Sequence, residues 1–469
     1  MQAILDHISA NSLRGHLSFI ASDLLEGRAT PSRGLDIAAE YIAAQFRIAG
    51  LEPAGDDGYF QTAAWSNVKP AAGFEMKIDT GGGRALSVSP EQITLHFHDG
   101  IELTGAELYK IDADHESKSD LQNRKDSVVV AELPDFSREH SFSKYRALVH
   151  SLERAKPKLS LLLTEDGLAE LNTSLVTPEN QSGENGVRRI IVRSSEALKW
   201  FRSAKAGPTG ATLSLRLPPG PEEQVKLRNV IGLLRGSDPE LKNTYLLVTA
   251  HYDHLGVRPD GDGDRIFNGA NDDGSGTVSV IELASALTTL NPRPKRSIVF
   301  MTFFGEEAGT LGSKYYAHHP VFPIGKTVAD VNLEQVGRTD ATDGRKRNQV
   351  AFTGFDYSDL PRIFQAAGKR TGVRVVSDAP YGDGFFERSD NAPLADEGIP
   401  SHTLVVAFDF PDYHRVGDEW QKIDYENMAK VDRMIALGLI MLADKPDAPR
   451  WNEAQSKTAP YIKAWQSHH

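Results

Sequence analysis

Histidine and carboxylate side chains follow four apolar segments in the second half of the chain. The segments and the side chains after them are 245–249 with His251, 297–304 with Glu306 and Glu307, 328–333 with Glu334, and 403–406 with His414. In open α/β sheets the ligand crevice lies at the carboxyl ends of the strands, so we expect these groups to converge. Each residue alone has an ordinary structural explanation, such as a half-buried histidine or a solvated helix start. Together they indicate a metal site.

A turn rich in acids lies between the first two of these segments. Asn271–Gly276 places Asp272 and Asp273 directly before an apolar, helix-like run. By itself such a turn is typical of a helix cap. Two buried anions, however, need a compensating positive charge, and the nearest Lys or Arg upstream in the sequence is Arg265. A bound cation would supply that charge.

Two bound divalent ions would balance the negative charges of these carboxylates. His251 and one acid would bind the first ion, His414 and another acid would bind the second, and the carboxylate of Asp272 can bridge both. The chain contains no cysteine, so thiolate sites and disulfides are excluded. Imidazole and carboxylate without thiolate favour catalytic zinc, with cobalt or manganese as possible substitutes.

Further acids have supporting roles in this prediction. Adjacent Glu306 and Glu307 cannot both point at one ion, so one coordinates and the other reaches the metal-bound water as a base. Asp253 and Asp418 follow the two histidines closely, and we expect them to accept the free imidazole N–H groups. Asp273 is expected to brace the turn or to cap the helix after it.

The elements that must position these groups form an alternating pattern. Val/Ile/Leu-rich strands separated by helices predict an α/β fold with a mixed, mostly parallel central sheet flanked by helices. Residues 98–217 form a smaller α/β unit, with strands at 127–131, 159–163, 189–192 and 212–217 and helices at 142–154 and 195–204. The Pro-rich stretch 218–221 closes this unit like a linker.

Composition limits the classes of protein. A chain of 469 residues exceeds one typical core, and its 40% hydrophobic and 25% charged residues are ordinary for a globular protein. The net charge of -12 argues against nucleic-acid binding, and no apolar run reaches the roughly 20 residues of a membrane helix. The first residues lack the apolar core of a signal peptide.

An ordered series of motifs adds a family resemblance. The motifs are AHYDHLG at Ala250–Gly256, NGANDDGSG at Asn268–Gly276, FFGEEAGTLGSKYY at Phe303–Tyr316, NLEQVGR at Asn332–Arg338, SDNAPLADEGIP at Ser389–Pro400, and YH at Tyr413–His414. With them the chain resembles the co-catalytic di-zinc peptidase family of bacterial aminopeptidases and glutamate carboxypeptidases, in the branch with an inserted protease-associated domain. The N-terminal pattern Leu24–Arg28 is also similar to this branch.

The resemblance implies a role for each site residue. It makes His251, Asp272, Glu307, Glu334 and His414 the ligands of two zinc ions, with Asp272 as the bridge. It makes Glu306 the general base, and Tyr413 a donor to the tetrahedral intermediate. The chain departs from the family pattern at Glu334, where many relatives have Asp, and at Asn391, where relatives often have His. Glu334 is long enough to shift the spacing of the metals, and neither change removes a required type of ligand.

The resemblance also implies an organisation and an activity. Residues 1–97 and 218–469 form the catalytic domain with the zinc exopeptidase fold, and 98–217 form a lid-like protease-associated domain. The expected enzyme is a metallo-aminopeptidase that removes N-terminal residues of peptides by means of a metal-bridging water activated by Glu306. The alternatives are a carboxypeptidase or dipeptidase, with Arg338 or Arg388 holding the substrate carboxylate, and a non-catalytic receptor-like protein. Relatives are commonly exported, which favours the periplasm or the exterior.

Overall fold

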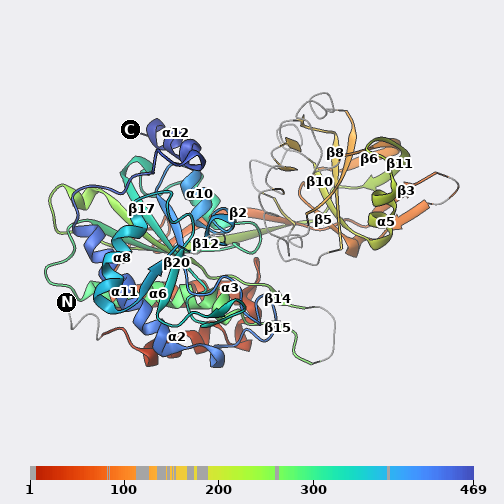
Figure 1. The fold of residues 1–469 in the computed structure, drawn as a ribbon. Coiled ribbons are helices and arrows are strands. Elements are labelled where there is room, and N and C mark those ends of the chain that lie inside the picture. Colours follow the sequence, from red (N-terminus) through yellow and green to blue (C-terminus); the bar gives the residue numbers. More distant parts are fainter. Residues whose placement is uncertain are drawn as a thin grey trace. The chain divides into compact units, whose positions relative to one another are not determined.

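The computed structural model describes residues 7–81, 83, 85–111, 126–134, 144, 148–149, 151–152, 155–165, 174–176, 188–258, 263–377 and 381–468. The chain divides into two compact units (Figure 1). The first unit comprises Met1–Ala63 and Leu227–His469, and the second comprises Ala64–Lys226. The predicted helix at 142–154 lies largely outside the described residues.

The first unit is built on a mixed sheet whose strand order is β21-β20-β22-β17-β13-β16-β12-β2, with the short strand β1 paired to β12. The strands are β1 (Glu52–Pro53), β2 (Phe60–Val68), β12 (Glu222–Leu234), β13 (Tyr245–His251), β16 (Ser297–Phe303), β17 (Thr327–Glu334), β20 (Gln349–Phe352), β21 (Arg374–Val376) and β22 (Ser401–Val405). Strand β13 is parallel to β16 and β17, and β17 is parallel to β22. Strands β12 and β20 pair antiparallel with β16 and β22.

The central strands are covered on both faces, which explains their continuous apolar sequences. Every residue of β16 and β22 is buried, as is all of β13 after its first residue. The predicted α/β class with a mixed, mostly parallel central sheet is therefore confirmed. Two small antiparallel pairs lie outside this sheet, β14 (Gly256–Val257) with β15 (Ile266–Phe267), and β18 (Asp340–Ala341) with β19 (Gly344–Arg345).

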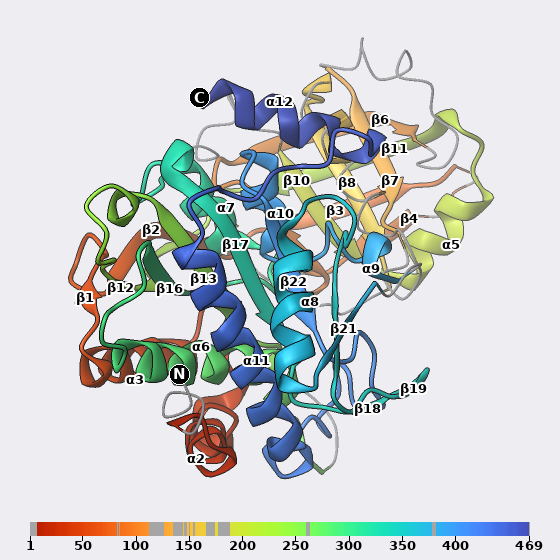
Figure 2. The same cartoon turned by 60° about the vertical axis from the view of Figure 1, so that its left-hand side comes forward.

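Helices pack in two groups around this sheet (Figure 2). One group contains α2 (Ala10–Ile20), α3 (Arg33–Ala49), α6 (Gly276–Thr288), α8 (Leu360–Thr371) and α11 (Tyr425–Asp444); the other contains α7 (Leu311–His318), α10 (Asn391–Asp396) and α12 (Ala459–Ser467). Local signals set the ends of α3: the side chain of Ser32 accepts from the backbone N–H of Leu35, and Gly50 ends the helix with a φ of 78°. Helix α6 is buried on almost every side because it lies against β13, β16 and β17 as well as α2, α3 and α11.

The second unit contains an eight-stranded sheet of order β4-β3-β11-β6-β7-β8-β10-β5 and the helix α5 (Ser195–Ser203). The strands are β3 (Glu75–Asp79), β4 (Ala85–Val88), β5 (Ile93–Leu95), β6 (Ile101–Lys110), β7 (Val128–Glu132), β8 (Leu159–Thr164), β10 (Arg189–Arg193) and β11 (Gly207–Leu217). A further short strand, β9 (Leu175–Val176), pairs with the end of β2.

The second unit is longer than the sequence predicts. It begins at Ala64 rather than at residue 98 and ends at Lys226 rather than at 217. The physical reason is strand pairing: β3 pairs with β11, and β5 pairs with β10, so residues that we assigned to the catalytic domain complete the sheet of the second unit. That this unit is a protease-associated domain stays a prediction.

Among the described residues, none of the helices has the length and apolar character needed to cross a membrane.

Candidate metal centre

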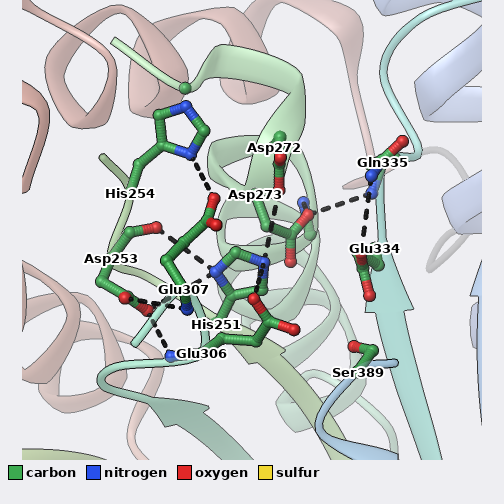
Figure 3. Close-up of polar contacts among 12 residues, drawn as sticks. His251, Asp253, His254, Asp272, Asp273, Glu306, Glu307, Glu334, Gln335 and Ser389 are labelled. Atoms are coloured by element: carbon green, nitrogen blue, oxygen red, sulfur yellow. Dashed lines mark hydrogen bonds and ion pairs between the residues drawn. The ribbon is translucent and has the colours of Figure 1, made fainter. Parts of the chain in front are cut away.

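The parallel strands of the first unit bring the predicted residues to one edge of the sheet. His251 is the last residue of β13 and Glu334 is the last residue of β17, while Glu306 and Glu307 follow β16 directly. Because these three strands are parallel, their carboxyl ends lie at the same edge. Figure 3 shows the side chains of His251, Glu306 and Glu307 gathered beside the Asp-rich turn.

Asp272 lies between two imidazoles. Its Oδ1 is 3.4 Å from Nε2 of His251, and its Oδ2 is 3.1 Å from Nε2 of His414. Burial opposes ionisation, but the two imidazoles hold the pKa of Asp272 well below its usual range. The carboxylate is therefore anionic and presents one oxygen to each histidine, as a bridging ligand must.

Two groups of side chains have the composition of metal sites, and both include Asp272. The groups are His251, Asp272 and Glu334, and His254, Asp272 and Glu307; within each group the ligand atoms lie within 4.8 Å of one another. His414 adjoins the second group, since its Nε2 is 3.4 Å from Oε2 of Glu307. The sharing of Asp272 by two donor groups is the geometry of a binuclear centre.

Four buried polar atoms test whether this centre fits two cations. They are Nε2 of His251, Nδ1 of His254, Oδ2 of Asp272 and Oε1 of Glu307. Each lies 2.7–3.4 Å from an imidazole or carboxylate atom of the same cluster. All four belong to the two donor groups, so divalent ions would satisfy them together. The residues present fit two metal ions.

Adjacent Glu306 and Glu307 have different surroundings. Glu307 is a member of a donor group, and although burial opposes ionisation, the neighbouring His414 lowers its pKa to about 2. Glu306 belongs to neither group, and its side chain keeps 12% of its surface exposed, with Oε2 3.9 Å from Nε2 of His251. Burial, together with the charges of Glu334 and Glu307, raises the pKa of Glu306 well above its usual value. A carboxylate of raised pKa at the open side of the centre is suited to accept a proton.

Asp253 supports this arrangement through contacts to both strand ends. Its Oδ1 is 3.5 Å from Nδ1 of His251, and its carboxylate accepts the backbone N–H groups of Glu306 and Glu307 at 3.0 and 3.3 Å. The hydroxyl of Thr30 also donates to it at 3.2 Å. The hydrogen bond of His251 Nδ1 is to the backbone carbonyl oxygen of Asp253 at 3.3 Å, so the role of its carboxylate toward the imidazole stays a prediction, while that carboxylate does fix the loop that carries the two glutamates.

Asp418 has a different role from the predicted one. Its carboxylate accepts the backbone N–H groups of Asn271 and Asp272 at 2.9–3.0 Å, rather than an N–H of His414. Burial raises the pKa of Asp418 to about 6, although these amide donors oppose the change. Spacing in the sequence suggested the histidine as its partner, but the fold turns the carboxylate toward the Asp-rich turn, which it braces.

Asp273 braces the same turn from the other side, the role predicted for it. Its Oδ1 accepts the backbone N–H of Gly276 at 3.0 Å and that of Gln335 at 3.1 Å. The carboxylate therefore ties the start of α6 to the end of β17. Asp272 and Asp273 are neighbours in sequence but act on different partners.

Arg28 is a site residue that the sequence reasoning missed. Its side chain is buried completely, and it donates to the carbonyl oxygens of Ile20, Tyr252, Asn268 and Gly269 at 2.6–3.0 Å. Burial lowers the pKa of Arg28 to about 10, still high enough to keep it charged, and Asp253 and Asp418 favour the charge. In the sequence, the nearest Lys or Arg upstream of the Asp-rich turn is Arg265. In the folded protein, a buried cation close to the site is Arg28, from the N-terminal region. The motif-like segment Leu24–Arg28 was the available signal.

His254 is the second missed residue. It lies in the same HYDH motif as His251, and its Nδ1 is 2.7 Å from Oε1 of Glu307. Three imidazoles, rather than the two predicted, therefore surround the acids.

Tyr413 packs against the last of these imidazoles. Its ring stacks on His414 with the centroids 4.1 Å apart and the planes at 26°. Burial and the negative charge of Asp272 raise the pKa of Tyr413 well above its usual value. The phenol is therefore protonated, as a hydrogen-bond donor must be.

The two arginines considered for a substrate carboxylate have different contacts. Arg338 is engaged by Asp340, with two bonds of 2.7 Å, and by Asp412 at 3.0 Å. Arg388 lies over the ring of Phe385, 4.3 Å from its centroid. Arg338 is thus committed to acids of its own chain.

The fold and the site together define a class, namely an α/β protein with two linked metal-donor groups at the carboxyl edge of its central sheet. Residues 229–438 match the family model of Peptidase family M28, and this segment is an M28 peptidase domain, which confirms the family resemblance.

Individual relatives agree with this assignment. A probable zinc metalloprotease of Pyrenophora tritici-repentis is 36% identical over 275 residues, covering 49% of this chain and 61% of that protein. Aminopeptidase YwaD of Bacillus subtilis is 26% identical over 239 residues, covering 49% of this chain and 48% of that protein. These matches span about half to three fifths of the curated relatives.

A solved structure extends the similarity of fold to nearly the whole chain. The aminopeptidase from Aneurinibacillus sp. strain AM-1 superposes with a TM-score of 0.60 at 19% identity and covers 96% of both chains. At this identity the likeness concerns the fold.

Proposed function

We propose that this protein is a zinc-dependent exopeptidase, and specifically an aminopeptidase that hydrolyses the N-terminal residues of peptides. The observation that carries the proposal is the pair of donor groups that share Asp272, with Glu306 beside them and outside both. Two zinc ions would occupy the groups, and cobalt or manganese could replace them. The M28 domain and the relatives named as zinc proteases and aminopeptidases support this reading.

Different side chains would bind the metal ions and transfer the proton. His251, Asp272, Glu307, Glu334 and His414 would hold the ions, which when bound supply Lewis acidity toward the scissile carbonyl and the attacking water. Glu306 takes the proton from that water as it attacks, and then gives the proton to the leaving amine. Its raised pKa suits both steps, because a strongly acidic carboxylate would take the proton poorly.

Tyr413 would stabilise the charge that develops during attack. Its phenol is protonated and stacks on His414, so we assign it the donor role toward the oxyanion of the tetrahedral intermediate.

A carboxypeptidase or dipeptidase on the same centre is the second candidate. Such an enzyme needs a cation to hold the substrate carboxylate, and Arg338 is already paired with two acids. Arg388 is then the remaining choice of the two, because its positive charge acts on Tyr413 beside the centre. Activity on amino-blocked peptides that disappears in Arg388→Ala would favour this candidate.

The decisive experiment combines metal analysis with the variant Glu306→Gln. We expect the wild-type protein to bind two zinc ions and to cleave peptides that have a free amine, including those with a blocked carboxyl end. Glu306→Gln should keep both ions but lose about 100-fold or more in kcat, the scale of general acid–base catalysis. Wild-type turnover by Glu306→Gln with its metal bound would refute the role of Glu306. A wild-type protein that took up no zinc or cobalt would instead support a receptor-like protein.

Export from the cell to the periplasm or the exterior also stays a proposal. Cell fractionation with an antibody against the protein would test it.

A further inference from the structure

The imidazole of His254 is held rigidly against the Asp-rich turn. Its side chain is completely buried, and its backbone N–H donates to the carbonyl oxygen of Arg28 at 3.2 Å. The ring lies directly against Gly269, whose φ is 55°, and a Cβ at that position would overlap the ring. Glycine is therefore required there both for its backbone conformation and for the space that the imidazole occupies.

The ring points at the metal centre (Figure 3). Nδ1 of His254 lies 2.7 Å from Oε1 of Glu307, and both atoms are buried. Asp272 supplies a third donor, and the three ligand atoms lie within 4.8 Å of one another. A buried imidazole nitrogen and two buried carboxylate oxygens this close together are the arrangement expected around a cation.

We propose that Nδ1 of His254 is itself a metal ligand, and that it binds the ion held by Asp272 and Glu307 in addition to His414. This inference rests on the proposed function, since it adds a ligand to the same centre. The two ions would then have unequal sets of ligands. One ion would be held in a pocket formed by His254, His414, Asp272 and Glu307, and the other in a pocket formed by His251, Asp272 and Glu334.

The unequal donor sets predict unequal metal binding. A site with two imidazoles favours zinc and cobalt, whereas a site with one imidazole and the same number of carboxylates tolerates manganese better. His254 is also the more protected of the two imidazoles, because the side chain of His414 is 25% exposed. We therefore expect the pocket of His254 to retain its ion more tightly.

The test compares two substitutions that separate a ligand from a hydrogen-bond donor. His254→Ala removes both functions, while His254→Asn places an amide N–H near the position of Nδ1 and so restores a donor to Glu307 without restoring a good ligand. His402→Asn is the matched control, since His402 is an equally buried imidazole that contacts Ser358 and the carbonyl oxygen of Thr353 instead. Zinc affinity would be measured on metal-free protein by competition with a chromophoric chelator, and the visible spectrum would be recorded after cobalt loading.

We expect wild-type and His402→Asn proteins to bind two zinc ions with similar affinities. Both His254 variants should bind one of the two ions at least about 100-fold more weakly, above the 10–100-fold loss typical of an outer hydrogen bond, and should show an altered cobalt band. Wild-type affinity and spectrum in His254→Asn would mean that His254 only positions Glu307, and unchanged binding in both variants would exclude any role. Either result, with two ions in the wild type, overturns this inference and leaves the proposed function standing. A wild type that binds no metal overturns both.

Discussion

At the scale of single residues, the two adjacent aspartates show how neighbours in sequence diverge in function. Asp272 faces His251 and His414, whereas Asp273 accepts backbone N–H groups of Gly276 and Gln335. One carboxylate is therefore available for metal and the other is part of the scaffold.

Substitution by asparagine should separate these roles. Asp272→Asn leaves a neutral amide that cannot bridge two cations, so we expect loss of bound metal and at least about a 100-fold drop in kcat/KM. Asp273→Asn keeps an oxygen for the two N–H donors, so its loss should stay within about tenfold. Metal content and peptide hydrolysis measured on the same samples provide the check, and equal losses at both positions would contradict the division.

A second acid, Asp330, predicts a pH dependence of stability away from the metal. Its carboxylate accepts from the hydroxyls of Thr249 and Ser401, and burial raises its pKa to about 7 despite these bonds. The folded state therefore holds this proton more tightly than the unfolded state does. The contribution of Asp330 to the free energy of unfolding is fully present below its pKa in the unfolded state, and it is lost as the pH rises from about 4 to about 7.

Asp330→Asn should remove this dependence. The free energy of unfolding of the variant relative to the wild type should increase with pH between about 4 and 8, on the order of a few kcal/mol at most. Urea denaturation of metal-free protein at several pH values measures the difference. The exposed Asp356→Asn is the control, and a parallel pH profile for the two variants would contradict the assignment.

At the scale of elements, the side chain of Arg28 links the N-terminal segment to the site through several hydrogen bonds. Arg28 donates to the carbonyl oxygen of Ile20 in the N-terminal segment. It also donates to the carbonyl oxygens of Tyr252, Asn268 and Gly269, which lie in the two segments that carry His251 and Asp272. No other residue type carries five donors in a planar fork, so lysine would satisfy fewer of these carbonyls.

Arg28→Met should therefore leave several buried carbonyls unpaired. We expect a loss of about 3–5 kcal/mol in the free energy of unfolding and weaker zinc binding. Arg235→Met is the control, because Arg235 forms an exposed ion pair with Glu52 whose loss should cost about 1 kcal/mol or less. Urea denaturation compares the two, and similar losses would show that Arg28 has no special role.

At the scale of the whole molecule, the clustered acids of the centre predict that folding depends on metal. Asp272 shares one donor group with Glu334 and the other with Glu307, and burial raises the pKa of Glu334. Ions that bind only the folded state stabilise it by about 3–4 kcal/mol at 100 to 1,000 times Kd.

Removing the metal should lower the Tm. Calorimetry after chelation should show a decrease of several degrees that zinc reverses and magnesium does not, since magnesium prefers ligand sets made of oxygen. The same Tm before and after chelation, with the loss of metal verified, would contradict a stabilising metal centre.

The sequence by itself determined the fold class and the chemistry of the strand ends. Continuous apolar strands indicate a sheet covered on both faces, and imidazole and carboxylate groups after several strands indicate a shared site, because both signals are local. Only the tertiary structure decided the partner of Asp418, the approach of Arg28, the orientation of His254 and the true start of the second unit at Ala64. Each of these depends on contacts between segments far apart in the chain, and no local pattern of residues encodes such contacts.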